Sequence, residues 1–153
     1  MPVLAAVERR PVLEVIMVTV YVRRRFVSSR EQVWGVMGDF WALDRWHPAV
    51  PNCHRDSEVT RRIELPGVSA VETLLPAECG AFRHVYLVEE SPMPLRDYRG
   101  RVEVHEVEGE GCLLEYEGTF EPAPGVPEKV TEKLLTRFFE SGFEAVAREL
   151  CER

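Results

Sequence analysis

The chain has 153 residues, 45% of them hydrophobic and 29% charged, which fits one globular domain with a substantial core. Its net charge of -7 argues against nucleic acid as a partner and against docking on anionic lipid, because both need a basic surface. The apolar segment 12–20 is too short and too interrupted to span a membrane, so stable membrane insertion is not expected.

The four cysteines are widely spaced and form no C-x-x-C pair, which predicts reduced thiols and a cytoplasmic location rather than two disulfides. No small-residue cleavage site follows the early apolar segment, so no signal peptide is expected. Met17 is a candidate natural start. Residues 1–16 would then be a leader that is flexible or lengthens the first strand, and residues 17–153 would form a single domain.

The first element is a strand from Val18 to Val27, because β-branched and aromatic residues alternate there with polar ones. Ser28 and Ser29 supply a helix N-cap. Two short helices should follow, at Arg30–Gly38 and Phe40–Trp46, the second ending before Pro48.

Six more strands should follow as a meander, because turn signals recur about every ten residues. We place them at Val50–Ser57, Val59–Leu65, Ser69–Pro76, Phe82–Glu90, Arg96–Val107 and Cys112–Glu121.

The segment Pro127–Arg153 predicts one long helix with an apolar stripe, since its apolar residues recur at steps of three and four. The stripe consists of Val130, Leu134, Leu135, Phe138, Phe139, Phe143, Val146, Ala147 and Leu150. Gly142 lies in mid-helix, where it allows either close packing against a neighbour or a gap that leaves room for a ligand. The predicted fold class is α+β, a seven-stranded curved antiparallel sheet wrapped around this helix, with a cavity between them.

Short segments in a fixed order carry a resemblance to a known family. They are Val33–Phe40, Trp46–Val50, Glu72–Leu75, Tyr86–Leu95, Tyr116–Pro122 and Phe138–Leu150. Together, over Met17 to Leu150, they resemble the START-like (SRPBCC) helix-grip superfamily, the polyketide cyclase/dehydrase and lipid-transport family, especially its small bacterial members, related to the birch-pollen allergen. The resemblance implies the helix-grip fold and a START-like domain over residues 17–153. It leaves function open, since such folds serve carriers, receptors, cyclases and regulators. The chain lacks the arginine often found before Glu72-x-Leu74, and it has Tyr116 where tryptophan is frequent.

Two candidate site residues adjoin at the end of the second short helix. Trp46 would stack on a flat ligand, and His47 would donate a hydrogen bond or move a proton. Alternatively, Trp46 plugs the core and His47 faces solvent.

Glu72 is a charged residue within a strand pattern, in phase with Ala70 and Leu74. If that face points inward, Glu72 is a buried carboxylate with a raised pKa or a basic partner, and a candidate acid or base. If not, it lies on an outer face. Arg83 is out of phase with Tyr86 and is expected outside.

Aromatic residues of the strands and the terminal helix share the predicted inner face. They form either a simple core or a pocket for an apolar or aromatic ligand. The predicted ligand-binding residues, with Trp46 and Glu72, are Tyr86, Tyr98, Tyr116, Phe120, Phe139 and Phe143.

No metal and no cofactor are expected, because the four histidines fall on different elements and no nucleotide-binding fingerprint occurs. The leading hypothesis is binding of a small hydrophobic molecule. The alternatives are a polyketide cyclase or dehydratase that uses Glu72, His47 or a tyrosine as proton carrier, and a regulatory protein-partner module, with a homodimer left open.

Overall fold

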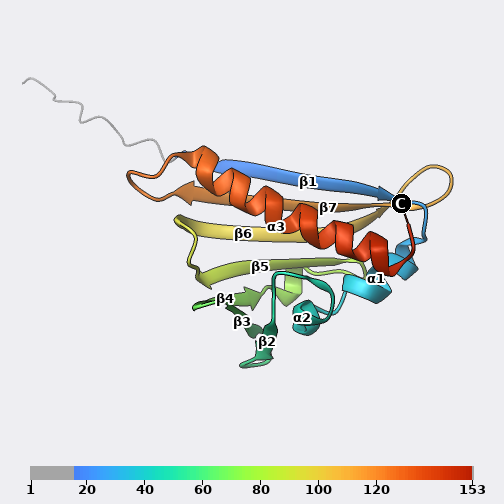
Figure 1. The fold of residues 1–153 in the computed structure, drawn as a ribbon, viewed down its shortest axis with the longest axis horizontal. Coiled ribbons are helices and arrows are strands. Elements are labelled where there is room, and N and C mark those ends of the chain that lie inside the picture. Colours follow the sequence, from blue (N-terminus) through green and yellow to red (C-terminus); the bar gives the residue numbers. More distant parts are fainter. Residues whose placement is uncertain (1–15, 153) are drawn as a thin grey trace, which may run out of the picture.

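Seven antiparallel strands form one sheet, and a long helix crosses its concave face in the computed structural model, which describes residues 16–152 (Figure 1). The strands lie in the order β1-β7-β6-β5-β4-β3-β2. The elements are β1 (Val18–Phe26), α1 (Arg30–Met37), the 3-10 turn η1 (Phe40–Ala42), α2 (Leu43–Trp46), β2 (Asn52–Arg55), β3 (Thr60–Leu65), β4 (Val68–Leu74), the 3-10 turn η2 (Pro76–Glu78), β5 (Arg83–Glu90), β6 (Leu95–Glu106), β7 (Cys112–Pro122) and α3 (Glu128–Glu149).

This arrangement confirms the predicted helix-grip fold. The predicted leader lies outside the described residues, apart from Ile16. The largest differences from the predicted strand ends are in β2, which covers only Asn52–Arg55, and in β4, which ends at Leu74 because Pro76 begins the turn η2. None of the helices within residues 16–152 combines the length and the apolar character that a membrane crossing needs.

The first and last strands pair along their whole length, from Val18 opposite Phe120 to Phe26 opposite Cys112. Side chains of alternate residues in β1 point into the core, so Val20 is buried and Tyr21 is exposed. The C-terminus is tied to the same region, because the Glu152 carboxylate accepts hydrogen bonds from the backbone N–H groups of Val27 and Ser28, at 2.6 and 2.9 Å.

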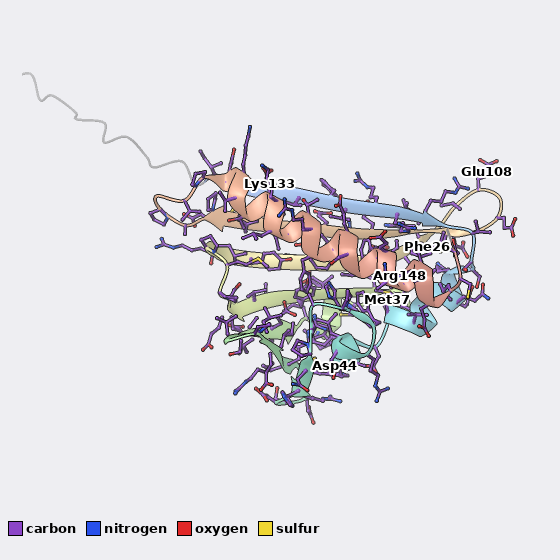
Figure 2. The ribbon with its side chains drawn as sticks, viewed as in Figure 1. Phe26, Met37, Asp44, Glu108, Lys133 and Arg148 are labelled. Carbon is purple, nitrogen blue, oxygen red and sulfur yellow. The ribbon has the colours of Figure 1, made fainter. Side chains whose placement is uncertain are left out.

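The helix α3 buries a narrower stripe than predicted. Its buried residues are Thr131, Leu135, Phe139, Gly142, Phe143, Val146 and Ala147. Val130 and Leu134, which were predicted in the stripe, are 46% and 43% exposed, because Thr131 and Leu135 occupy the centre of the buried face at that end. Lys133 and Arg148 lie toward opposite ends of α3 and are exposed, whereas Phe26 and Met37 belong to the main buried cluster (Figure 2).

Two glycines shape the floor of the concave face. Gly100 of β6 and Gly118 of β7 stand opposite each other, and the rings of Tyr86 and Tyr116 lie where their side chains would be. Because only a residue without Cβ leaves this space, the tyrosine rings lie flat against the sheet.

Candidate functional site

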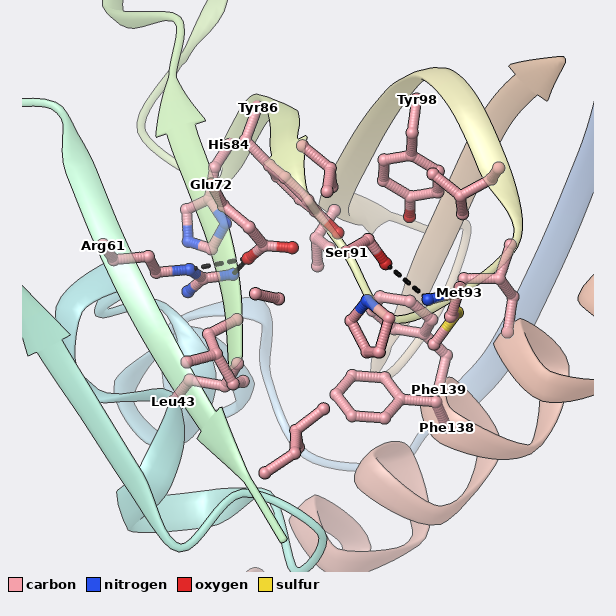
Figure 3. Close-up of a pocket in the computed structure, with 18 of the residues that line it drawn as sticks. Leu43, Arg61, Glu72, His84, Tyr86, Ser91, Met93, Tyr98, Phe138 and Phe139 are labelled. Carbon is pink, nitrogen blue, oxygen red and sulfur yellow. Dashed lines mark hydrogen bonds and ion pairs between the residues drawn. The ribbon is translucent and has the colours of Figure 1, made fainter. Parts of the chain in front are cut away.

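A cavity lies between the concave face of the sheet, α3 and the short helices (Figure 3). The space that the centres of water-sized molecules can occupy measures about 70 Å³, and all the space between its walls, mouth included, measures about 800 Å³. The polar lining residues are Asp39, Arg61, Glu72, His84, Tyr86, Ser91 and Tyr98. The remaining lining is apolar and includes Met37, Leu43, Trp46, Ile63, Leu65, Ala70, Val88, Met93, Leu95, Leu135, Phe138 and Phe139.

A buried ion pair forms the polar wall. Arg61 of β3 stands opposite Glu72 of β4, and its Nε and Nη2 atoms donate to Glu72 Oε1 at 2.8 and 2.6 Å. Its Nη1 donates to the carbonyl oxygen of Phe40 at 2.5 Å, and the guanidinium lies 3.7 Å from the centre of the Phe40 ring. The inward orientation predicted for Glu72 is therefore present, with Arg61 as the basic partner. Sequence reasoning missed Arg61, although it shares the phase of the buried Ile63.

The second carboxylate oxygen of Glu72, Oε2, remains available to accept a hydrogen bond. Both hydrogen bonds from Arg61 end on Oε1, and within residues 16–152 no donor reaches Oε2. Figure 3 shows this oxygen directed toward the cavity, on the side of Tyr86. A ligand in the cavity can therefore donate a hydrogen bond to Glu72 without breaking the ion pair.

His84 lies beside this pair and was also missed, although its two-residue spacing from Tyr86 put it in phase with a predicted site residue. Its Nε2 donates to the carbonyl oxygen of Gly38 at 3.0 Å, so its Nδ1 is an acceptor. Burial lowers the pKa of His84 to about 4. The imidazole is therefore neutral at pH 7.

The tyrosines lie on the cavity floor. Tyr86 and Tyr98 line the cavity, and the Tyr98 hydroxyl hydrogen-bonds the hydroxyl of Tyr116 beneath it. Burial raises the pKa of all three hydroxyls above the ordinary value of 10.0, so each stays protonated. The floor therefore offers neutral hydroxyl groups.

Five predicted ligand-binding residues line the cavity: Trp46, Glu72, Tyr86, Tyr98 and Phe139. The structure places the other three in packed core, outside the lining. Tyr116 is covered by the Phe139 ring, which stacks on it at 3.5 Å between centroids. Phe120 and Phe143 are 0% and 1% exposed.

His47 is neither a cavity residue nor a solvent-facing one. It is 2% exposed, its Nδ1 accepts from the Ala49 N–H at 3.1 Å, and its Nε2 donates to the Phe138 carbonyl oxygen at 2.7 Å. Burial lowers its pKa to about 4. Because both nitrogens are engaged away from the cavity, His47 is withdrawn as a catalytic candidate.

The glycine of α3 provides close packing rather than a ligand gap. A Cβ on Gly142 would lie 2.7 Å from His47 Cδ2 and 3.1 Å from Trp46 Cζ3. The missing side chain therefore lets the end of α2 approach the helix, and His47 and Trp46 fill the space.

Metal-binding geometry is not found within residues 16–152, where no three His, Cys, Asp or Glu side chains could hold one ion. Cys53, Cys79, Cys112 and Cys151 are free thiols. Arg83 pairs with Glu103 at 3.9 Å and is absent from the cavity lining, as expected from its phase.

Comparisons with known proteins agree with this architecture. A family model described as polyketide cyclase / dehydrase and lipid transport matches residues 17–151. No curated protein matches the chain.

Solved structures with similar folds come from several bacteria. An uncharacterised protein from Bacillus thuringiensis is 24% identical with a TM-score of 0.77, and the match covers 88% of this chain and 100% of that one. The protein XoxI from Bacillus cereus is 24% identical with a TM-score of 0.75, covering 86% and 94%. A START superfamily protein from Mycobacterium smegmatis is 17% identical with a TM-score of 0.67, covering 87% and 95%. At these identities the similarity shows the fold alone.

Proposed function

The chain belongs to the polyketide cyclase/dehydrase and lipid transport family, and from this premise we propose that it binds a small hydrophobic or aromatic molecule between the sheet and α3. The observation that carries the proposal is the cavity itself, which is mostly apolar but contains a few convergent polar groups. This combination is typical of small-molecule sites. Four free thiols support a cytoplasmic location as part of the proposal.

The size of the cavity limits the ligand. One water needs roughly 10–15 Å³ of space for its centre, so the 70 Å³ available here holds several waters. Anything larger than a small aromatic ring needs side chains at the mouth to move. We expect Met93 and Leu95 to move, because both line the cavity, are only partly buried and lie at the connection from β5 to β6.

Binding of a neutral hydrophobic fluorophore, N-phenyl-1-naphthylamine, tests the proposal. Ala70 is buried in the lining and Ala81 is exposed outside it, so Ala70→Phe fills the cavity and Ala81→Phe is its matched control. We expect saturable fluorescence enhancement with the native chain and Ala81→Phe, and its loss in Ala70→Phe with an unchanged circular dichroism spectrum. Equal signals from all three proteins would refute binding in the cavity.

A second candidate is proton transfer of the cyclase or dehydratase type, favoured by the free oxygen of Glu72. As a general base, Glu72 would take a proton from a carbon between two carbonyl groups of the substrate and return it at another position. Deuterium exchange into a small β-diketone, followed by NMR, tests this. We expect Glu72→Gln to lose any acceleration that the native chain shows, and no acceleration by the native chain would eliminate this candidate.

A further inference from the structure

We propose that the ligand is uncharged and that it donates a hydrogen bond from a hydroxyl or N–H group to the second carboxylate oxygen of Glu72. This inference rests on the proposed binding function and names the chemical class of the ligand. It follows from three properties of the polar wall: a free acceptor, a neutralised arginine and an apolar surrounding.

The free acceptor is Glu72 Oε2. Glu72 as a residue is 8% exposed, but its Oε2 can still be reached by water, because it is not one of the buried side-chain atoms that lack a hydrogen-bond partner. A donor group on a ligand would replace that water, and a hydrogen bond to a charged acceptor is stronger than one between neutral groups. A ligand that supplies the missing donor therefore binds better than one that only fills the space.

Arg61 does not provide an anion site. Its Nε and Nη2 donate to Glu72 and its Nη1 donates to the Phe40 carbonyl oxygen, so its charge is already balanced by Glu72. A ligand carboxylate beside this pair would meet Glu72 Oε2, and the cavity also includes Asp39. Two negative groups at hydrogen-bond distance repel each other, so the site should reject carboxylic acids in their ionised form.

Apart from Asp39, the other polar lining groups are neutral. His84 keeps a neutral imidazole whose Nδ1 accepts, and Tyr86 and Tyr98 keep their protons. Among the described lining residues, Arg61 is the single permanent cation. The wall therefore complements a donor group on an otherwise apolar molecule, for which a short alkylphenol is a fitting model.

Three probes of nearly equal size distinguish these properties: 4-propylphenol, propylbenzene and 4-propylbenzoate at pH 7. Affinity is measured by displacement of N-phenyl-1-naphthylamine. We expect the phenol to bind at least about tenfold more tightly than propylbenzene, which corresponds to one charge-assisted hydrogen bond. We expect the benzoate to bind more weakly than propylbenzene.

A charge-removing variant tests the role of Glu72 directly. Glu72→Gln keeps an oxygen for Arg61 but removes the negative charge, so Arg61 is no longer balanced. We expect the order to reverse, with the benzoate gaining at least about tenfold relative to the phenol. Glu64→Gln removes the same charge from a neighbouring strand at a side chain that is 46% exposed, and it should preserve the native order.

The outcomes separate the inference from the function on which it rests. If propylbenzene binds as tightly as the phenol, or the benzoate binds most tightly to the native chain, the inference is wrong while binding stands. If neither the fluorophore nor any probe binds, both the inference and the proposed binding function are wrong. Should Glu72→Gln fail to fold, the comparison of three probes on the native chain still decides the matter.

Discussion

Arg61 and Glu72 face each other across β3 and β4, with 2.6 Å between Arg61 Nη2 and Glu72 Oε1. Their side chains are 7% and 11% exposed, so the pair is formed largely out of water. Removing both charges from water is costly, and the pair persists because each charge neutralises the other. The ion pair therefore gives the cavity one charged wall, opposite a wall that is apolar.

Breaking this pair should destabilise the protein strongly. Arg61→Met leaves Glu72 as an uncompensated buried charge, and we expect a loss of about 3–5 kcal/mol in the free energy of unfolding. Urea denaturation at pH 7 measures the change. The neighbouring Arg62, whose side chain is 51% exposed, pairs with Asp56 at 3.0 Å. Arg62→Met should cost less than about 1 kcal/mol, and equal losses from the two variants would contradict the buried pair.

Replacing each of the two helical glycines, Gly35 and Gly142, by alanine should change the stability of the protein in opposite directions. Alanine normally stabilises a helix interior by roughly 1 kcal/mol relative to glycine. At Gly142 the added methyl group would collide with the His47 ring, at 2.7 Å from Cδ2, so Gly142→Ala should destabilise by about 1–3 kcal/mol. At Gly35 nothing lies within 4 Å, so Gly35→Ala should stabilise. A thermal melt of each variant checks the prediction, and a stabilised Gly142→Ala would disprove the close packing of α3 on His47.

Stability should fall when the pH drops from 6.5 to 4. Burial lowers the pKa values of His47 and His84 from 6.5 to about 4, so the unfolded chain binds more protons than the folded chain within this window. The contribution of the two neutral histidines to the free energy of unfolding is fully present above pH 6.5. It is lost toward pH 4, by on the order of 3 kcal/mol for each histidine. Urea midpoints at pH 7 and pH 5 measure the effect. His84→Gln should reduce it and the control His54→Gln, at an exposed position, should not; an unchanged midpoint in the native chain would contradict the prediction.

The Glu115 carboxylate adds a second, more acidic phase. Desolvation raises its pKa, but the hydrogen bonds from Arg101, Arg23 and His105 together outweigh this effect and lower the pKa from 4.5 to about 2. Its contribution to stability is therefore present above pH 4.5 and is lost toward pH 2. Glu115→Gln should flatten the pH dependence of the urea midpoint between pH 4.5 and pH 2, whereas an unchanged slope would contradict this assignment.

The hydroxyl groups of Tyr98, on the cavity floor, and Tyr116, beneath it, should show energetic coupling. Tyr98→Phe leaves the Tyr116 hydroxyl buried without its partner, and we expect a loss of about 1–3 kcal/mol. Replacing both tyrosines by phenylalanine should cost less than the sum of the single changes, because no orphaned hydroxyl remains. Tyr21→Phe, at a residue that is 47% exposed, is the control. Additive losses in urea denaturation would show that the two hydroxyls do not interact.

Much of the fold could be predicted because the two hydrophobic periods are clear. Alternation in β1 and β7 and steps of three and four in α3 identify the strands and the helix before their packing is known. These periods do not specify where an element ends, and the burial of Thr131 instead of Val130 depends on the angle at which α3 crosses the sheet. No local pattern specifies that angle.

The candidate site could be predicted only in part, for a related reason. The strand phase of Glu72 and Tyr86 gives the face on which they lie. The phase does not show whether a side chain reaches the cavity. Tyr116 also points inward, but the Phe139 ring stacks on it and separates it from the cavity. The same phase applied to β3 would have found Arg61 beside Ile63, whereas the burial of His47 depends on a contact with α3, 91 residues away.

The most direct test of the central claim is an NMR measurement of where a small ligand contacts the protein. With methionine methyl groups labelled, the account predicts intermolecular nuclear Overhauser effects from 4-propylphenol to Met37 and Met93, which line the cavity, and none to Met17, which is 48% exposed and outside the lining. Contacts to Met17 alone, or none to Met37 and Met93 at saturating ligand, would contradict it.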